Sequence, residues 1–276
     1  MYGAVLTAAP FLFPLTGWPV PLAVFNIEMP STLDYHQLRT FKDMKKTQSC
    51  AVLFSGGLDS TTVLYWALAR FSPVYALTFD YGQRHRIEIQ LARRAARRLE
   101  VSQVILKAGF SGIGGSALTD LSKSLPRFED SMRKASPPAT YVPFRNGVFL
   151  SLAAAWAEGH GVNNIACGFH AVDSPDYPDT KPEFVRAMEK AINEGTKAVF
   201  GGQRMKVLVP LIGMDKVGII KTGLSLRADY SLSYSCYAGG RVPCGKCAAC
   251  RLRTAAWKRI GQKDPYLVRL EKEGGK

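Results

Sequence analysis

The first 27 residues of the chain contain no charged side chain. A secretory signal opens with a positively charged segment, which is missing here, and Pro10, Pro14, Pro19 and Pro21 would repeatedly break a membrane-spanning helix. We therefore expect neither an export signal nor a membrane anchor in this stretch. Residues 1–46 are predicted to form a weakly ordered extension, with the functional part of the chain after it.

Other familiar features are missing between residues 47 and 260. The sequence shows no internal repeat and no low-complexity tract, which argues against a repeat architecture. It has no Walker lysine motif. The nearest dinucleotide fingerprint, at Gly112, Gly114 and Ala117, has no acidic residue about twenty positions later at the end of a second strand. Two common nucleotide-binding motifs are therefore discounted.

Acidic residues are too few to balance the basic ones. The 36 lysines and arginines exceed the 22 aspartates and glutamates and leave a net charge of +14, which favours anionic partners such as nucleotides, carboxylates or RNA. An arginine-rich stretch over residues 84–98 is amphipathic, with Ile87, Leu91 and Ala95 on its apolar side. Its basic side is either a solvated helix face or a footprint for RNA or phosphate.

Four of the six cysteines fall within the fifteen residues from Cys236 to Cys250. Without a secretory signal, such a cluster indicates reduced thiols that hold a metal rather than a disulfide framework. A cytoplasmic location follows as an expectation. Cys50 and Cys167 lie outside the cluster and are interpreted as small core residues.

Short apolar runs alternate with helical patterns along the chain. This alternation predicts an α/β fold, a Rossmann-like, doubly wound parallel sheet covered by helices on both faces. Ligands of such sheets bind beyond the carboxyl ends of the strands, where the strand order reverses. The expected strands are 51–54, 74–79, 103–107, 164–169 and 206–211, and the expected helices are 59–70, 84–99, 145–159, 180–194 and 214–223. We predict a nucleotide-binding domain over 47–230 and a cysteine-bearing helical segment over 231–276.

The sequence SGGLDS at Ser55–Ser60 follows the first expected strand and precedes a helix. Such a turn exposes several backbone N–H groups at the positive end of the helix dipole and so forms an anion cradle. Glycines let a phosphate approach closely, the serine hydroxyls add donors, and Asp59 either caps the helix or helps to hold Mg²⁺. A plain capped glycine turn is the alternative. The predicted binding residues are Phe54, Ser55, Gly56, Gly57, Leu58, Asp59, Ser60 and Thr61.

Residues 109–143 lack clean periodicity and are rich in Gly, Ser and Pro. We interpret this stretch as a long loop over the ligand edge of the sheet, where such loops act as lids.

The cysteines Cys236, Cys244, Cys247 and Cys250 form a C-x7-C-x2-C-x2-C pattern. Four thiolates at this spacing close a tetrahedral site and leave no position for catalytic water, which predicts structural Zn²⁺. An iron–sulfur cluster also accepts four cysteines and remains an alternative, as do free or redox-paired thiols.

The SGGLDS loop resembles the pyrophosphate loop of the PP-loop ATP pyrophosphatases, a branch of the HUP fold group whose members adenylate their substrates. Together with the cysteine pattern and the segments between them, it resembles one PP-loop family, the QueC family of 7-cyano-7-deazaguanine synthases. The matching segments are SGGLDSTTVLYWAL, FDYGQRH, YVPFRNGVFLSLAA, PDYPDTKPEFVRAM, VPLIGMDKVGIIKTG and SLSYSCYAGGRVPCGKCAACRLR. They cover residues 50 to 258.

The resemblance implies an ATP-dependent ligase that converts 7-carboxy-7-deazaguanine and ammonia to a nitrile, on the route to queuosine in tRNA. Its implied partners are these small molecules, ATP with Mg²⁺, and a second copy of the chain in a homodimer; direct RNA binding is not expected. Asp59, Ser60, Arg145 and Lys216 are the predicted catalytic residues, with Arg145 holding an anion and Lys216 neutralising phosphate charge. Further candidates for the ligand edge are Arg84, His85, Asn146, Asp173, Tyr177 and Asp179.

The chain departs from the family pattern at two places. Family members commonly have Gly where this chain has Phe144, whose ring we expect to narrow or reshape the lid, and residues 172–178 differ from the expected segment. Two alternative functions stay open. One is a PP-loop tRNA thiolase or cyclase, which would need a persulfide-carrying or cluster-binding cysteine near the adenylate. The other is a non-enzymatic zinc-knuckle nucleic-acid binder.

Overall fold

The computed structural model of the chain describes residues 48–110, 112–131, 137–170 and 177–274. The expected extension over 1–46 lies outside the described residues, as does Asp173. No helix within the described ranges is both long enough and apolar enough to cross a lipid bilayer.

A five-stranded parallel sheet lies at the centre of the fold, with the strand order β3-β2-β1-β4-β5. Its strands are β1 (Cys50–Leu53), β2 (Val74–Asp80), β3 (Ser102–Lys107), β4 (Asn164–Ala166) and β5 (Lys206–Leu208). The chain first builds outward from β1 through β2 to β3 and then returns to place β4 on the other side of β1. The strand order therefore reverses between β1 and β4, which is where sheets of this class bind ligands.

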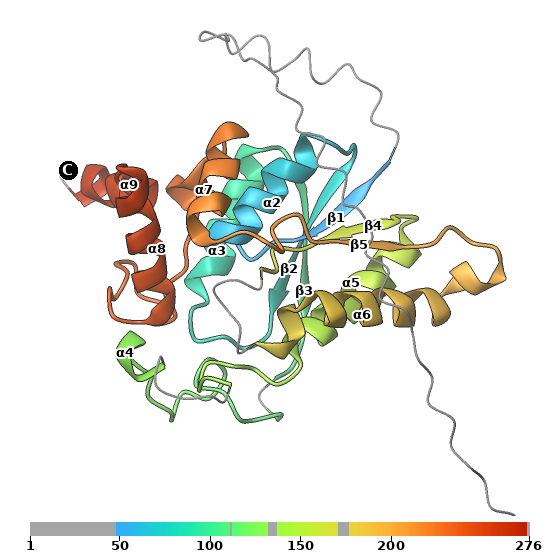
Figure 1. Cartoon of the computed structure of the whole chain (residues 1–276), viewed down its shortest axis with the longest axis horizontal. Coiled ribbons are helices and arrows are strands. Elements are labelled where there is room, and N and C mark those ends of the chain that lie inside the picture. The colour runs from blue at the N-terminus through green and yellow to red at the C-terminus, as the bar shows by residue number, and fades with distance from the viewer. Residues whose placement is uncertain (1–47, 111, 132–136, 171–176, 275–276) are drawn as a thin grey trace, which may run out of the picture. The chain divides into compact units, whose positions relative to one another are not determined.

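Helices cover both faces of the sheet (Figure 1). On one face, Ala51 and Leu53 of β1 pack in a core with α5 (Arg145–Gly159) and α6 (Pro182–Glu194). The alternate residues Cys50 and Val52 face the opposite core. That core is formed with α2 (Leu58–Leu68), α3 (Ile87–Arg98), α7 (Lys216–Ser225) and α8 (Ala248–Ile260). Side chains alternate across a strand, so strands buried on both faces are apolar throughout, and the doubly wound prediction is confirmed.

The five predicted strands and five predicted helices are all present, but β4 and β5 end earlier than expected. The apolar run that contains β4 was expected to continue to residue 169, yet the strand stops at Ala166 because Gly168 turns against the first turn of α2. The run that contains β5 stops at Leu208, two residues before Pro210, which has no N–H to donate to a neighbouring strand. Both runs therefore supply loop residues to the ligand edge.

The described residues of 109–143, the region predicted as a lid, are anchored to the core and to the cysteine segment. Phe110, Leu118 and Val142 are buried in the core, and the short helix α4 (Phe128–Ser131) joins the cysteine segment through a hydrogen bond from Phe128 N to the carbonyl of Lys246 at 3.1 Å. None of the described residues between 109 and 143 lines the cavity presented below. The described part of this region therefore packs against the core and the cysteine segment, outside the cavity lining, and its role as a lid stays a prediction.

Helices α8 and α9 follow α7 in the chain. Helix α8 begins directly after Cys247, and α9 (Pro265–Gly274) packs against the short turn at Tyr230–Leu232. The side chain of Arg253 on α8 is bound by Asp264 through two hydrogen bonds of 2.5 and 2.8 Å, and this pair fixes the angle between the two helices. Both side chains are about one-tenth exposed, so the pair is largely shielded from solvent.

Candidate functional site

The loop after β1 turns sharply into α2. Gly56 has φ +80°, a conformation that side chains rarely adopt, and a Cβ atom there would lie 3.0 Å from Cβ of Ala92 on α3. Gly57 is the N-cap of α2 and has extended backbone angles. The carbonyl of Gly56 accepts a hydrogen bond from Tyr234 N at 2.8 Å, so the cysteine-bearing segment holds the turn from outside. The geometry of this turn therefore requires glycine at position 56.

Three backbone N–H groups at the start of α2 have no acceptor among the described residues. They belong to Leu58, Asp59 and Ser60, whereas Thr61 N already donates to the carbonyl of Gly57 at 3.0 Å. The first N–H groups of any helix have no partner within the helix, and they attract anions. The loop thus keeps its donors available for a ligand.

The hydroxyls of Ser55 and Ser60 lie together in the loop, 3.1 Å apart. Ser55 Oγ also accepts from Gly57 N at 3.2 Å, and Ser60 Oγ donates to the carbonyl of Gly57 at 3.2 Å. These weak, exposed or half-buried contacts preshape the loop, and an anion can replace them with stronger charge-assisted bonds.

Asp59 does not cap its helix. Its carboxylate accepts hydrogen bonds from Lys216 Nζ at 2.8 and 2.7 Å, and the ring of His170 lies beside both groups. His170 Nε2 is 2.8 Å from Lys216 Nζ and 3.6 Å from an oxygen of Asp59. Lys216 is the first residue of α7, which is capped by the side chain of Asp215. Three separate elements thus bring an acid, an amine and an imidazole to the glycine turn after β1.

Burial by itself would raise the pKa of Asp59, but the neighbouring Lys216 ammonium and His170 outweigh that effect and hold the pKa well below its usual range. Asp59 is therefore a fixed negative charge at neutral pH. Its charge holds Lys216 next to the unpaired N–H groups of α2.

A cavity of about 310 Å³ opens at this edge of the sheet. Its volume lies at the lower end of the range for small-molecule sites, roughly 300 to 1,000 Å³. Among the predicted loop residues, Gly56 and Thr61 stay out of its wall. The members that line it are Phe54, Ser55, Gly57, Leu58, Asp59 and Ser60.

Aromatic side chains line another part of the same cavity. The rings of Tyr81 and Phe149 meet edge to face at a centroid distance of 5.4 Å, and the guanidinium of Arg145 lies over both at 5.8 and 6.0 Å. Arg145 Nη1 donates to the hydroxyl of Tyr81 at 3.3 Å. Burial raises the pKa of Tyr81 to about 12, so this hydroxyl stays protonated. An anion that enters the cavity meets Arg145 in an apolar setting, where its charge is little screened.

Arg145 begins α5 after an unusual turn at Phe144, whose φ of +52° lies in the left-handed region. This conformation explains why glycine suits the position. The Phe144 ring packs on Phe184 at a centroid distance of 5.9 Å and does not line the cavity, and its expected effect on the lid stays a prediction.

The other ligand-edge candidates divide into two groups. His85, Asn146 and Tyr177 line the cavity. Arg84 instead donates to the carbonyls of Asp120, Leu121 and Lys123 and anchors the region predicted as a lid. Asp179 accepts a hydrogen bond from Asn146 N at 3.1 Å and fixes the start of α5, outside the cavity lining.

Sequence reasoning missed His170 and Glu88. His170 follows β4 closely. Its position just beyond the carboxyl end of a predicted strand could have identified it as a candidate for the ligand edge. Glu88 lies in the arginine-rich helix, and the sequence argument interpreted only the basic side of that helix. It is 8% exposed and lines the cavity.

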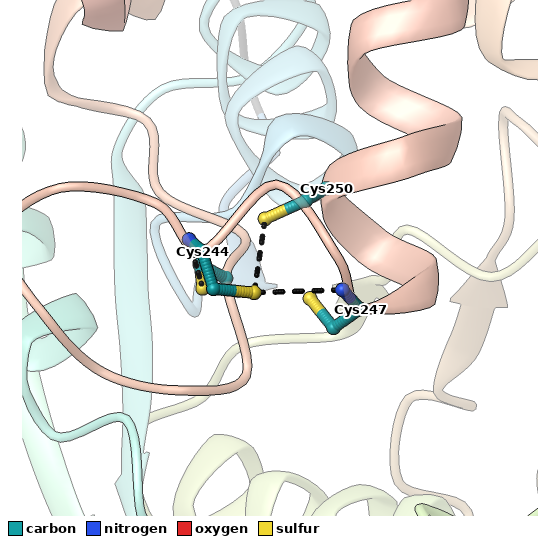
Figure 2. A group of neighbouring side chains, drawn as sticks. Cys244, Cys247 and Cys250 are labelled. Carbon is teal, nitrogen blue, oxygen red and sulfur yellow. Dashed lines mark hydrogen bonds between the residues drawn. The ribbon is translucent and has the colours of Figure 1, made fainter. Parts of the chain in front are cut away.

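The four clustered cysteines converge on one point. Their sulfur atoms all lie within 4.8 Å of one another, and Figure 2 shows Cys244, Cys247 and Cys250 gathered at the start of α8. The sulfurs of Cys244 and Cys250 are 4.0 Å apart. Zn–S bonds of about 2.3 Å place the sulfurs of a tetrahedral site about 3.8 Å apart, so the arrangement fits a single ion. A four-iron cluster binds each thiolate to a different iron and needs wider spacing.

The thiols in the cluster affect one another's ionisation. Hydrogen bonds from Cys247 and Cys250 lower the pKa of Cys236, and the neighbouring Cys236 raises the pKa of Cys247 to about 11. Four thiolates this close are stable together only around a cation. Burial raises the pKa of Cys50 to about 12 and raises that of Cys167 as well, and both side chains are fully buried, as expected for core residues.

Similarity to known proteins was found at three levels. The family described as "Queuosine biosynthesis protein QueC" matches residues 49–261. The 7-cyano-7-deazaguanine synthase of Persephonella marina is 42% identical over 81% of this chain and 98% of that protein. The protein of the same name from Pseudomonas syringae pv. tomato is 46% identical over 80% of this chain and 98% of its own length.

Among solved structures, the U34-tRNA thiolase NcsA from Methanococcus maripaludis aligns with a TM-score of 0.42 and 14% identity, over 86% of this chain and 76% of that chain. We draw no functional conclusion from a structural similarity this low. The family match, in contrast, spans the loop after β1, the whole sheet and all four clustered cysteines. On this evidence, the chain belongs to the QueC family of queuosine biosynthesis proteins.

Proposed function

We propose that the protein converts 7-carboxy-7-deazaguanine, ammonia and ATP to 7-cyano-7-deazaguanine. The observation that carries this proposal is the set of unpaired N–H groups of Leu58, Asp59 and Ser60 in the wall of a cavity that also holds Lys216 and Arg145. Donors of this kind bind the phosphates of ATP, and the cavity beside them accepts a small anionic heterocycle. The family assignment supplies the chemical class of that heterocycle.

In the first activation, a carboxylate oxygen of the substrate attacks the α-phosphorus of ATP and pyrophosphate leaves. Negative charge then builds up on the phosphate oxygens, next to the N–H groups at the start of α2 and the hydroxyl of Ser60. Lys216 exchanges part of its contact with Asp59 for these oxygens. Arg145 holds the carboxylate in position, since its guanidinium can bind two oxygens at once.

Ammonia then attacks the carbonyl carbon of the acyl adenylate, AMP leaves, and loss of a proton gives the primary amide. The amide oxygen attacks a second ATP in the same site and releases a second pyrophosphate. Loss of AMP and a proton from this imidate forms the carbon–nitrogen triple bond. Each turnover therefore consumes two ATP for one nitrile.

Mg²⁺ would enter with ATP. Asp59 is the carboxylate next to the unpaired N–H groups, and both of its oxygens accept bonds from Lys216. A magnesium ion would compete with Lys216 for these oxygens, and its chemical contribution would be to neutralise the phosphates. The Asp59 carboxylate could therefore supply one ligand to Mg²⁺, and phosphate and water would supply the remaining ligands.

We further propose that Cys236, Cys244, Cys247 and Cys250 hold a structural Zn²⁺ ion. The support is the close approach of their four sulfur atoms, a group that no described His, Asp or Glu joins. Thiolates that bind zinc need a reducing compartment, which supports a cytoplasmic location. A homodimer is proposed from the family resemblance and is testable by light scattering.

The proposed function is tested by incubating the purified protein with ATP, ammonium and 7-carboxy-7-deazaguanine and detecting the nitrile by mass spectrometry. AMP and pyrophosphate should each form at two equivalents per nitrile. Ser60→Ala should reduce turnover, because it removes a phosphate donor. Ser225→Ala is the matched control, since Ser225 is exposed at the end of α7 and donates only to a carbonyl of its own helix.

Folded, zinc-loaded protein that forms no nitrile would refute the substrate assignment. Equal turnover of the two serine variants would refute the site assignment alone. The thiolase alternative gains no support from the described cysteines, because Cys167, which lines the cavity, is fully buried with a raised pKa and is poorly suited to carry sulfur.

A further inference from the structure

Two carboxylates line the cavity within the described part of the chain, Asp59 and Glu88. Lys216 binds both oxygens of Asp59. Glu88 is engaged through Oε1 alone, which accepts from Gln83 Nε2 at 3.0 Å and lies 3.4 Å from His85 Nε2. No described residue donates to Oε2 of Glu88, so this acceptor is available to a ligand.

Burial of this carboxylate is costly unless its charge is compensated. The side chain of Glu88 is 10% exposed, and it lies in the first turn of α3, where the helix dipole favours negative charge. Gln83 is itself 1% exposed and is fixed by bonds to the backbone at Phe79 and Tyr81. Gln83 therefore holds one oxygen of Glu88 firmly, and the carboxylate cannot rotate freely.

Glu88 lies beside His85, which belongs to a group of three rings in the cavity wall. His85 lies 6.5 Å from Tyr81 and 6.1 Å from Tyr237, measured between ring centroids, and all three rings line the cavity. Aromatic side chains bind a planar heterocycle by stacking, which contributes about 1–3 kcal/mol for a nucleobase. A buried acceptor at the edge of such a group of rings is suited to reading the edge of the stacked heterocycle.

We propose that Oε2 of Glu88 reads the donor edge of a guanine-type base, accepting hydrogen bonds from the ring N1–H and the exocyclic 2-amino group. The assignment rests on the proposed function for the class of substrate. A carboxylate only accepts, so it pairs with adjacent donors, whereas an adenine-type ring presents an unprotonated ring nitrogen that repels it. Glu88 is thus a specificity residue. The substrate's own carboxylate, at the opposite side of the ring system, is left free to face the phosphates of ATP.

The test measures binding without turnover. Calorimetry with 7-cyano-7-deazaguanine, and with the same compound lacking its 2-amino group, is performed on the wild-type protein and on Glu88→Gln. The wild type should bind the parent compound about 10- to 100-fold more tightly than the analogue, the range expected for a hydrogen bond to a buried charge. Glu88→Gln should lose a similar factor for the parent and discriminate little between the two compounds.

Glu183→Gln on α6 is the matched control, because the side chain of Glu183 is 72% exposed and, within the described ranges, pairs with the exposed Arg186 alone. It should keep the wild-type discrimination. The KM for ATP should stay unchanged in Glu88→Gln, which separates base recognition from damage to the phosphate site.

Equal binding of both compounds by the wild type would overturn the proposal, even if the Glu88 variant fails to fold. An equal loss of affinity for both compounds in Glu88→Gln would also overturn it, since that result indicates a structural role. If the wild type discriminates as expected but forms no nitrile from the acid, the proposed function fails and the assignment of Glu88 stands.

Discussion

Substituting Gly168 by alanine tests how the end of β4 supports the glycine turn after β1, which we propose binds phosphate. A Cβ atom on Gly168 would lie 3.1 Å from the carbonyl carbon of Asp59, 3.2 Å from its Cβ and 3.2 Å from Ser60 N. These separations are shorter than ordinary contacts, and two of the three atoms belong to backbone at the start of α2. The backbone must shift by a few tenths of an ångström to accept the methyl group.

The size of the effect follows from the groups that shift. Overpacking of this kind costs about 1–3 kcal/mol of folding stability. If one N–H contact to a phosphate oxygen is lost, a charge-assisted bond worth about 1.5–3 kcal/mol disappears from ATP binding. That loss corresponds to a roughly 10- to 150-fold weaker complex. We therefore expect the variant to fold, with reduced stability and much weaker nucleotide binding.

Calorimetry with a non-cleavable ATP analogue measures the affinity, and denaturant unfolding measures the stability. Gly109→Ala is the control, because no atom lies within 4 Å of a Cβ at that exposed position and its φ is not positive. Wild-type affinity for the analogue in Gly168→Ala would show that the close approach of β4 does not shape the turn, and the reasoning would be wrong.

Three further predictions follow from the same geometry. Removal of zinc by a chelator, or Cys250→Ser, should abolish binding of the ATP analogue and lower the melting temperature, with about one zinc per chain found in the untreated protein by elemental analysis. Phe144→Gly should be about 1 kcal/mol more stable than Phe144→Ala in denaturant unfolding, because only glycine adopts the left-handed φ without strain, and neither change should alter the KM for the base. Burial opposes ionisation of Asp59, but Lys216 and His170 depress its folded-state pKa, so its contribution to stability is present above the unfolded value of about 3.9 and is lost as pH falls further. The difference in unfolding free energy between wild type and Asp59→Asn should therefore shrink below about pH 4, and a difference that is constant with pH would contradict the assignment.

Local patterns were sufficient to predict the sheet and its covering helices. Strands such as Cys50–Leu53 are apolar on both faces, and helices such as Pro182–Glu194 show a clear helical period, so these elements could be recognised from their own residues. The ends of β4 and β5 could not be predicted in the same way. Apolar residues such as Phe169 and Leu211 are buried as well as strand residues are, but they are buried in loops at the ligand edge.

The glycine turn after β1 and its available N–H groups could be predicted because they come from consecutive residues, while phosphate binding there stays a prediction. The rest of the site is assembled from separate parts of the chain. His170 approaches Asp59 only because β4 lies beside β1, and Glu88 faces the cavity only because α3 packs over Gly56. Such neighbours depend on strand order and helix packing, and a pattern read along the chain does not contain them.

The cysteine segment is part of the site, even though it follows the sheet in the sequence. Tyr234, Ser235, Tyr237 and Arg253 line the same cavity as the turn after β1, and Tyr234 N binds the carbonyl of Gly56. Tyr234, Ser235 and Tyr237 flank Cys236, and Arg253 follows Cys250 by three residues, so a metal ion there would fix the path of the chain that supports the glycine turn. Loss of the ion would then release this support locally, at a smaller free-energy cost than global unfolding. A structural metal can therefore control nucleotide affinity without contacting the nucleotide, and ligand binding should fail at a lower chelator concentration than the fold of the sheet.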